Sequence, residues 1–231
     1  MAYLPGERPL VYPWQNDASF RPSDCDVATR SITVKRDVSG PGSAYVEWGN
    51  GSSMTKVIAV VKGPTQQSTL RAIFEVDVSF TSFASIIPNQ HDSSKEIASY
   101  IKEGFEGCID MDQYPQCAVS VFVKVIECGE CIHTTISACI LAAVEACAAA
   151  GIASHDSIIC LPVGVLSNGE FIVNPSTKDC ATCSVSIGMT VKSRQVVFIH
   201  ATGTLSKPVD QIDSLVNLVD GSVDKFRQLV I

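Results

Sequence analysis

The alternation of apolar and polar residues along the chain predicts a fold with several strands and three helices. Strands are expected where β-branched and aromatic residues recur at every second position. These segments are 32–34, 44–48, 54–61, 70–80, 117–127, 157–166, 171–173, 184–191 and 195–201. Gly63-Pro64 is expected to turn the chain after the third strand, and Asn168-Gly169 predicts a hairpin between the sixth and seventh.

Three further segments have helical spacing. The first is expected to begin near Ser93, which has capping-box spacing with Glu96. The second, 134–150, is apolar on almost every side and ends at Gly151, which predicts a buried helix. The third is expected to begin near Pro208. This order predicts an α/β (α+β) fold, a single domain of mixed β-sheets with packed helices over residues 24–231, after an irregular N-terminal arm, 1–23.

Composition narrows the class of protein. With 231 residues, 46% of them hydrophobic, the chain is long enough to bury one substantial core. No apolar run approaches the roughly 18 residues of a membrane span, and the N-terminus does not resemble a secretory signal, so no membrane is expected. The net charge is −7 and basic residues are scattered, which argues against a domain that grips RNA alone. Without an export signal, the ten cysteines are read mostly as small buried hydrophobes, as at Cys139, Cys147 and Cys160.

Several local strings, in order, resemble the RNase PH family. They are Gly42–Asn50 (GSAYVEWGN), Thr55–Pro64 (TKVIAVVKGP), Tyr114–Ile152 and Asn174–Lys178 (NPSTK). Together the resemblance covers roughly residues 24–205. It implies an RNase PH-like fold. Activity is a separate question, because a fold hosts a site without guaranteeing it.

The resemblance implies that a phosphorolytic member holds phosphate with an arginine before the buried helix and uses carboxylates after the hairpin. The arginine position falls here on Ile132, and the acidic positions fall on Asn174, Cys180 and Ser186. Because both halves of the site are altered, we expect no phosphorolysis. The segment 81–92, where active members carry arginines for RNA, contains no Arg or Lys.

The resemblance therefore implies a non-catalytic structural subunit of the exosome's six-membered core ring, supporting 3′-to-5′ RNA processing and degradation. Implied partners are the other RNase PH-like ring subunits, RNA-binding cap subunits and RNA within the assembled ring, in the nucleus, nucleolus and cytoplasm, with no cofactor. The alternative is an active phosphorolytic or metal-dependent ribonuclease that uses Asp179 and Glu130, with a homodimer as a further option.

Two Cys-x-x-Cys pairs, Cys128 with Cys131 and Cys180 with Cys183, offer four thiolates of the kind that bind zinc. The 48 intervening residues far exceed compact zinc-ribbon spacing, so buried or idle thiols are the preferred interpretation. A redox dithiol is disfavoured because neither pair is expected to open a helix.

The remaining polar residues have simpler interpretations. His133, Ser137 and Asp179 form a conceivable hydrolytic triad, but Ser137 is expected on the buried helix and outside any nucleophile elbow. The other candidates are expected to be solvated turn or loop residues, or aromatic residues of the arm that pack on protein rather than stack on a base. They are Asp110 and Asp112, His155 and Asp156, and Tyr12 and Trp14.

Overall fold

The structure, a computed structural model, describes residues 32–49, 54–68, 71–84, 90–129, 131–166, 169–175, 181–204 and 208–230. Its strands form two sheets, β1-β2-β3-β5-β4 and β7-β6-β8-β9. The strands are β1 (Ile32–Arg36), β2 (Ser43–Trp48), β3 (Thr55–Gln66), β4 (Ile73–Phe80), β5 (Cys117–Glu127), β6 (Ile158–Val165), β7 (Phe171–Val173), β8 (Cys183–Thr190) and β9 (Val196–Gly203). The helices are α1 (Gln90–Glu106), α2 (Ile132–Ala149) and α3 (Pro208–Val230), with a 3₁₀ turn at Met111–Gln113. The predicted fold class is confirmed.

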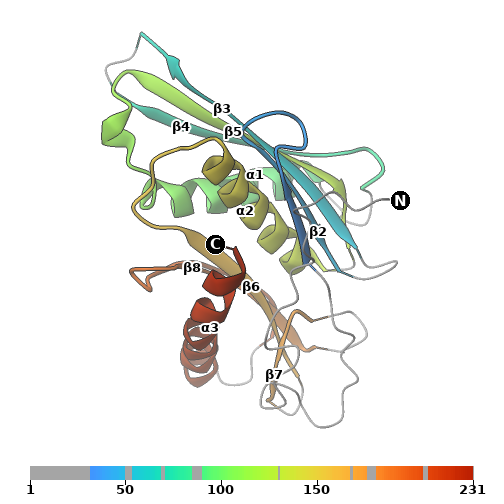
Figure 1. The fold of residues 1–231 in the computed structure, drawn as a ribbon. Coiled ribbons are helices and arrows are strands. Elements are labelled where there is room, and N and C mark those ends of the chain that lie inside the picture. Colours follow the sequence, from blue (N-terminus) through green and yellow to red (C-terminus); the bar gives the residue numbers. More distant parts are fainter. Residues whose placement is uncertain are drawn as a thin grey trace.

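The first sheet is mixed because β4 and β5 run parallel while its other pairs are antiparallel. Two adjacent parallel strands need a long crossover, and α1 supplies it. Figure 1 shows α1 and α2 beneath this sheet, with the second sheet and α3 beyond them. Helix α2 packs against strands of both sheets, and α3 packs on β6 and β8. Every residue of β6 is buried, because that strand is covered on both faces.

Helix α2 is the centre of the core. By length and composition alone it is apolar enough to cross a membrane, so the prediction that no apolar segment reaches that length is wrong. Within the fold, 78% of the helix is buried, as is typical of a core helix between two sheets. The predicted cysteine burial is confirmed for Cys139 and Cys147 on this helix and for Cys160 on β6.

The chain around Gly63-Pro64 differs from prediction. Strand β3 continues through this pair, with an irregularity in its pairing to β5 between Lys62 and Thr65, so the predicted turn is wrong. Proline has no N–H for the ladder and is tolerated at such a bulge. Gly63 has φ of +131°, and a Cβ there would lie 2.6 Å from the Ala118 carbonyl oxygen. Glycine is therefore required where β3 approaches β5.

Other boundaries shift by a few residues. Helix α1 begins at Gln90 rather than Ser93, and α2 begins at Ile132 rather than at residue 134. The β6–β7 hairpin is confirmed by antiparallel pairing and by Gly169 at φ +86°, while Asn168 lies outside the described residues. The predicted arm, 1–23, with Tyr12 and Trp14, also lies outside them.

Candidate functional site at the amino end of helix α2

Three positions singled out from the sequence meet at the amino end of α2. Ile132 is the first residue of that helix, Asn174 follows β7, and Ser186 lies within β8. Thr134 Oγ1 lies 3.5 Å from Asn174 Oδ1, and His133 Nδ1 lies 2.8 Å from Ser186 Oγ. The fold thus gathers segments that lie about 40 to 50 residues apart in the chain. Cys180, Asp179 and Glu130 lie outside the described residues.

His133 is the polar centre of this site. Its ring is 1% exposed, and its nitrogens lie 2.8 Å from Ser186 Oγ and 2.7 Å from Thr202 Oγ1 on β9. Burial, with a smaller contribution from nearby His200, lowers the pKa of His133 to about 4. The ring is therefore neutral at pH 7, and a neutral imidazole offers one donor and one acceptor to its two hydroxyl partners. Ser186 itself is fully buried, so its hydroxyl serves this network.

A second polar chain leads from this site to the surface of α1. The rings of His133 and His200 have centroids 5.2 Å apart, and His200 Nδ1 lies 2.9 Å from the Tyr100 hydroxyl. That hydroxyl also donates to Glu96 Oε1 at 2.8 Å, while the ring of Tyr100 stacks on Phe198. Burial and the Glu96 carboxylate raise the pKa of Tyr100, so the phenol stays protonated. These contacts join α1 to β9.

Among the described residues at this site, no Lys or Arg stands ready to hold a phosphate. Ile132 is aliphatic and half-buried, and the sequence from Cys128 to Ala150 contains no Lys or Arg. The amino end of a helix favours anions, but a tightly held phosphate is normally also met by a cationic fork. Neutral hydroxyls, an amide and a neutral imidazole fill the described part of the site.

The conceivable hydrolytic triad is not assembled by the described residues. Ser137 Oγ donates to the His133 carbonyl at 2.9 Å and lies 3.3 Å from Cys160 Sγ. The imidazole of His133 bonds instead to the hydroxyls of β8 and β9. Ser137 is 1% exposed and points into the core. No nucleophile and base are therefore paired through Ser137.

The cysteine pairs are only partly described. Cys131 is the N-cap of α2, so the prediction that neither pair opens a helix is wrong, because the helix begins earlier than its periodicity suggested. Burial raises the pKa of Cys128 to about 11, which keeps it a thiol rather than a reactive thiolate. Cys183 begins β8 and is buried. Across the described ranges no three His, Cys, Asp or Glu residues are grouped to hold a metal, and Cys180 falls in a gap.

The acidic and histidine residues near the helix-to-strand turns have structural contacts. Asp110 accepts a hydrogen bond from Gln113 and lies 3.5 Å from His155 Nε2, while Asp112 is exposed on the 3₁₀ turn. Asp156 accepts backbone N–H bonds from residues 192 and 193. Burial opposes its charge, but these bonds hold the pKa of Asp156 below its usual value. It ties the start of β6 to the β8–β9 turn.

Sequence reasoning missed Thr202, His200 and Tyr100. His200 lies in the predicted strand 195–201, but Thr202 lies one residue beyond it. Had the strand been extended, the spacing of two residues would have placed both on one face. Nothing in the local sequence indicates that this face meets α1 and the first turn of α2.

Comparisons with known proteins agree with this fold. A family model described as "3′ exoribonuclease family, domain 1" (RNase PH) matches residues 26–153. An exosome complex component, RRP41-like, from Arabidopsis thaliana is 31% identical over 177 residues, which is 74% of this chain and 66% of the relative. The exosome complex component SKI6 of Saccharomyces cerevisiae is 24% identical over 201 residues, 82% of this chain and 78% of the relative.

Solved structures show the same architecture. The crystal structure of rice (Oryza sativa) Rrp46 has a TM-score of 0.71 at 18% identity, covering 86% of this chain and 92% of that one. The Archaeoglobus fulgidus exosome with RNA bound to the active site has a TM-score of 0.69 at 19% identity, covering 86% and 87%. At these identities the likeness establishes the fold.

Proposed function

We propose a scaffolding role for this chain, which belongs to the RNase PH family of 3′ exoribonucleases because the family model matches more than half of its 231 residues. The role is that of a non-catalytic structural subunit of an exosome core ring that supports 3′-to-5′ RNA and rRNA processing and degradation. Relatives from a plant and a yeast are named exosome complex components, which supports the assignment to this complex.

The proposal that the subunit is non-catalytic rests on the residue types at the amino end of α2. Ile132 stands at the implied phosphate-binding position, and Ser186 stands at an implied acidic position. Ser186 is buried and bonded to His133, whose lowered pKa leaves it uncharged at pH 7. The described residues of the site are uncharged and bonded to one another, which supports a site that neither binds phosphate nor stabilises a departing sugar oxygen.

The charge of the whole chain supports dependence on partners. RNA affinity rests largely on neutralising phosphates, and this chain has a net charge of −7. We infer that RNA passes through the assembled ring on basic residues of the other RNase PH-like subunits and of RNA-binding cap subunits. The working compartments are then the nucleus, nucleolus and cytoplasm.

Gentle purification of the tagged chain from its own cells tests the ring assignment. We expect five other RNase PH-like chains and small RNA-binding cap proteins in near-equal amounts, measured by quantitative mass spectrometry. Recovery of the chain alone, or only as a homodimer, would refute the ring assignment.

An RNA-shortening assay tests the alternative, an active ribonuclease. The carboxylates Asp179 and Glu130, which are close in sequence to Cys180 and Ile132, favour this alternative. The purified chain is incubated with 5′-labelled RNA, with and without inorganic phosphate, and with and without Mg²⁺ or Mn²⁺. We expect no shortening in any condition. Shortening that depends on phosphate or metal and disappears in Asp179→Asn or Glu130→Gln would establish the alternative.

A further inference from the structure

Strand β4 ends the five-stranded sheet. In the part of the chain that the structure describes, its only strand partner is β5. Alternate residues of an edge strand direct their N–H and C=O groups away from the sheet, where a further strand can pair with them. Helix α1 packs against β4, so the core-facing side of the strand is covered. None of the described strands pairs with its outward edge, so that edge is the part considered for a partner.

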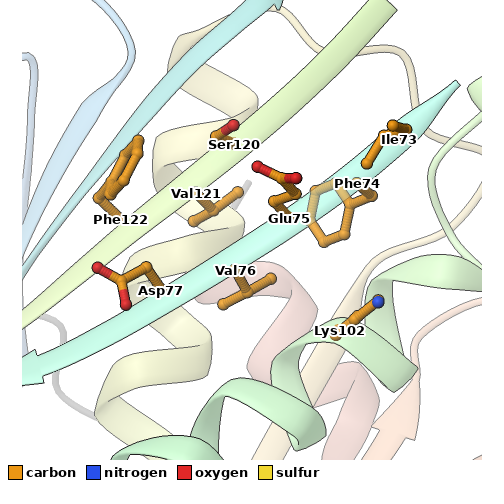
Figure 2. A pocket seen from close by; sticks show the side chains of 9 residues that line it. All are labelled: Ile73, Phe74, Glu75, Val76, Asp77, Lys102, Ser120, Val121 and Phe122. Atoms are coloured by element: carbon orange, nitrogen blue, oxygen red, sulfur yellow. The ribbon is translucent and has the colours of Figure 1, made fainter. Parts of the chain in front are cut away.

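A hollow of about 390 Å³ lies along this edge. Figure 2 shows its walls, which come from β4 and β5, with Lys102 approaching from α1. Apolar side chains contribute much of the lining, among them Phe122, which is 39% exposed. Lys62 Nζ lies 5.2 Å from the centre of the Phe122 ring, so this ring already forms a cation–π contact with a lysine.

Two exposed carboxylates lie on the edge strand β4. Glu75 and Asp77 are exposed and share the outward face of β4, because they are two residues apart. Their partners across β5 are Ser120 and Phe122, neither of which is basic. Within the described ranges neither carboxylate forms an ion pair. The one cation in the lining, Lys102, is 4.0 Å from Glu106 on its own helix.

The negative charges of Glu75 and Asp77 decide which kind of partner can bind along the β4 edge. Antiparallel pairing with β4 of a second copy, centred on Val76, would set each Glu75 against the other copy's Asp77 at about 5 Å, which is destabilising. An RNA backbone would meet the same repulsion. We propose that the β4 edge is a docking surface for a basic, extended segment of a partner polypeptide. The segment pairs with the backbone of β4, and its alternate Lys or Arg side chains face Glu75 and Asp77, with their stems over Phe122. No residue of the α2 site takes part, and the inference does not depend on the ring assignment.

The test is a fluorescence-anisotropy titration of the full chain with defined probes. The probe is a labelled ten-residue peptide that alternates Arg and Val. The comparison probes are the same peptide with Glu in place of Arg, the Arg peptide N-methylated at alternate residues, and a ten-nucleotide single-stranded RNA. We expect binding of the Arg peptide alone, since the others lack either the charge or the donors for strand pairing.

The double variant Glu75→Gln/Asp77→Asn removes both charges with little change of shape. We expect its affinity for the Arg peptide to fall about fivefold, the equivalent of about 1 kcal/mol for two exposed ion pairs. The matched control, Asp112→Asn/Asp213→Asn, changes net charge equally at exposed positions on other elements and should bind as the wild type does.

Three results would overturn the inference. They are no binding of the Arg peptide, an equal loss of affinity in the two double variants, and RNA binding that depends on this edge. In the first case the acids serve only to keep the edge from aggregating. If ring chains co-purify while the peptide test fails, the docking inference falls and the proposed function stands.

Discussion

Acidification should destabilise the fold through His133. Its pKa is lowered from 6.5 to about 4, so between these values the unfolded chain binds a proton that the folded chain excludes. Stability therefore rises with pH across this window and is lost as the pH falls from about 6.5 toward 4. One pH unit is worth about 1.4 kcal/mol for one such proton, so lowering the pH from 7 to 5 should cost about 2 kcal/mol from this residue.

Urea unfolding at the two pH values measures this cost, with Trp48, which is 1% exposed, as a fluorescence reporter. Because other groups also contribute to the pH dependence of stability, the comparison is with His133→Gln. The wild type should lose about 2 kcal/mol more than this variant between pH 7 and pH 5. His155→Gln, at a largely exposed side chain, is the control for replacing a histidine by glutamine. If His133→Gln loses as much stability on acidification as the wild type, the buried neutral histidine is not the cause.

Three further outcomes follow from the structure. Arg36→Ala should lower stability by about 1–2 kcal/mol at pH 7.5 in urea unfolding, because buried Glu145 loses the cation 2.6 Å away, and half-exposed Arg36 limits the effect. Since burial raises the pKa of Glu145, this loss should shrink as the pH falls toward 4.5 and a proton replaces the cation. Gly63→Ala should cost about 2–3 kcal/mol, because its φ is positive and the new Cβ would meet a carbonyl oxygen at 2.6 Å. Iodoacetamide at pH 8 should not modify Cys139 in the folded chain, as mass spectrometry would show, because complete burial raises its pKa.

Each of these has a matched control. Lys56→Ala removes the partly exposed Lys56–Glu127 pair and should cost less than about 1 kcal/mol, with little dependence on pH. Gly107→Ala adds a Cβ that meets nothing within 4 Å and should be almost neutral. Cys139 should react once urea unfolds the chain. Equal costs for Arg36→Ala and Lys56→Ala, or for the two glycine variants, would contradict the corresponding reasoning, as would rapid labelling of folded Cys139.

Many strands and turns of the fold follow from local sequence patterns. Alternation in 117–127 and 70–80 marks strands because a pleated strand turns every second side chain to the same face. The Asn-Gly hairpin follows in the same way from the φ that glycine allows. The prediction at Gly63-Pro64 was wrong because the same two residues suit a turn or a bulge, and pairing between β3 and β5 decides which forms.

The candidate site was likewise predicted only in part from the sequence. Ile132 and Ser186, at positions that the resemblance implies, were identified from spacing within a family-like pattern, since spacing is a property of the chain. Their surroundings were not: the bonds from His133 to Ser186 and Thr202 join residues 53 and 69 positions apart. The neutral state of His133 depends on its burial between α2 and the second sheet, and desolvation acts only once those elements have packed. The sequence by itself thus determined which residue types stand at the positions that the resemblance implies. The tertiary structure decided what the described residues there do, because hydrogen bonding and desolvation require packed elements.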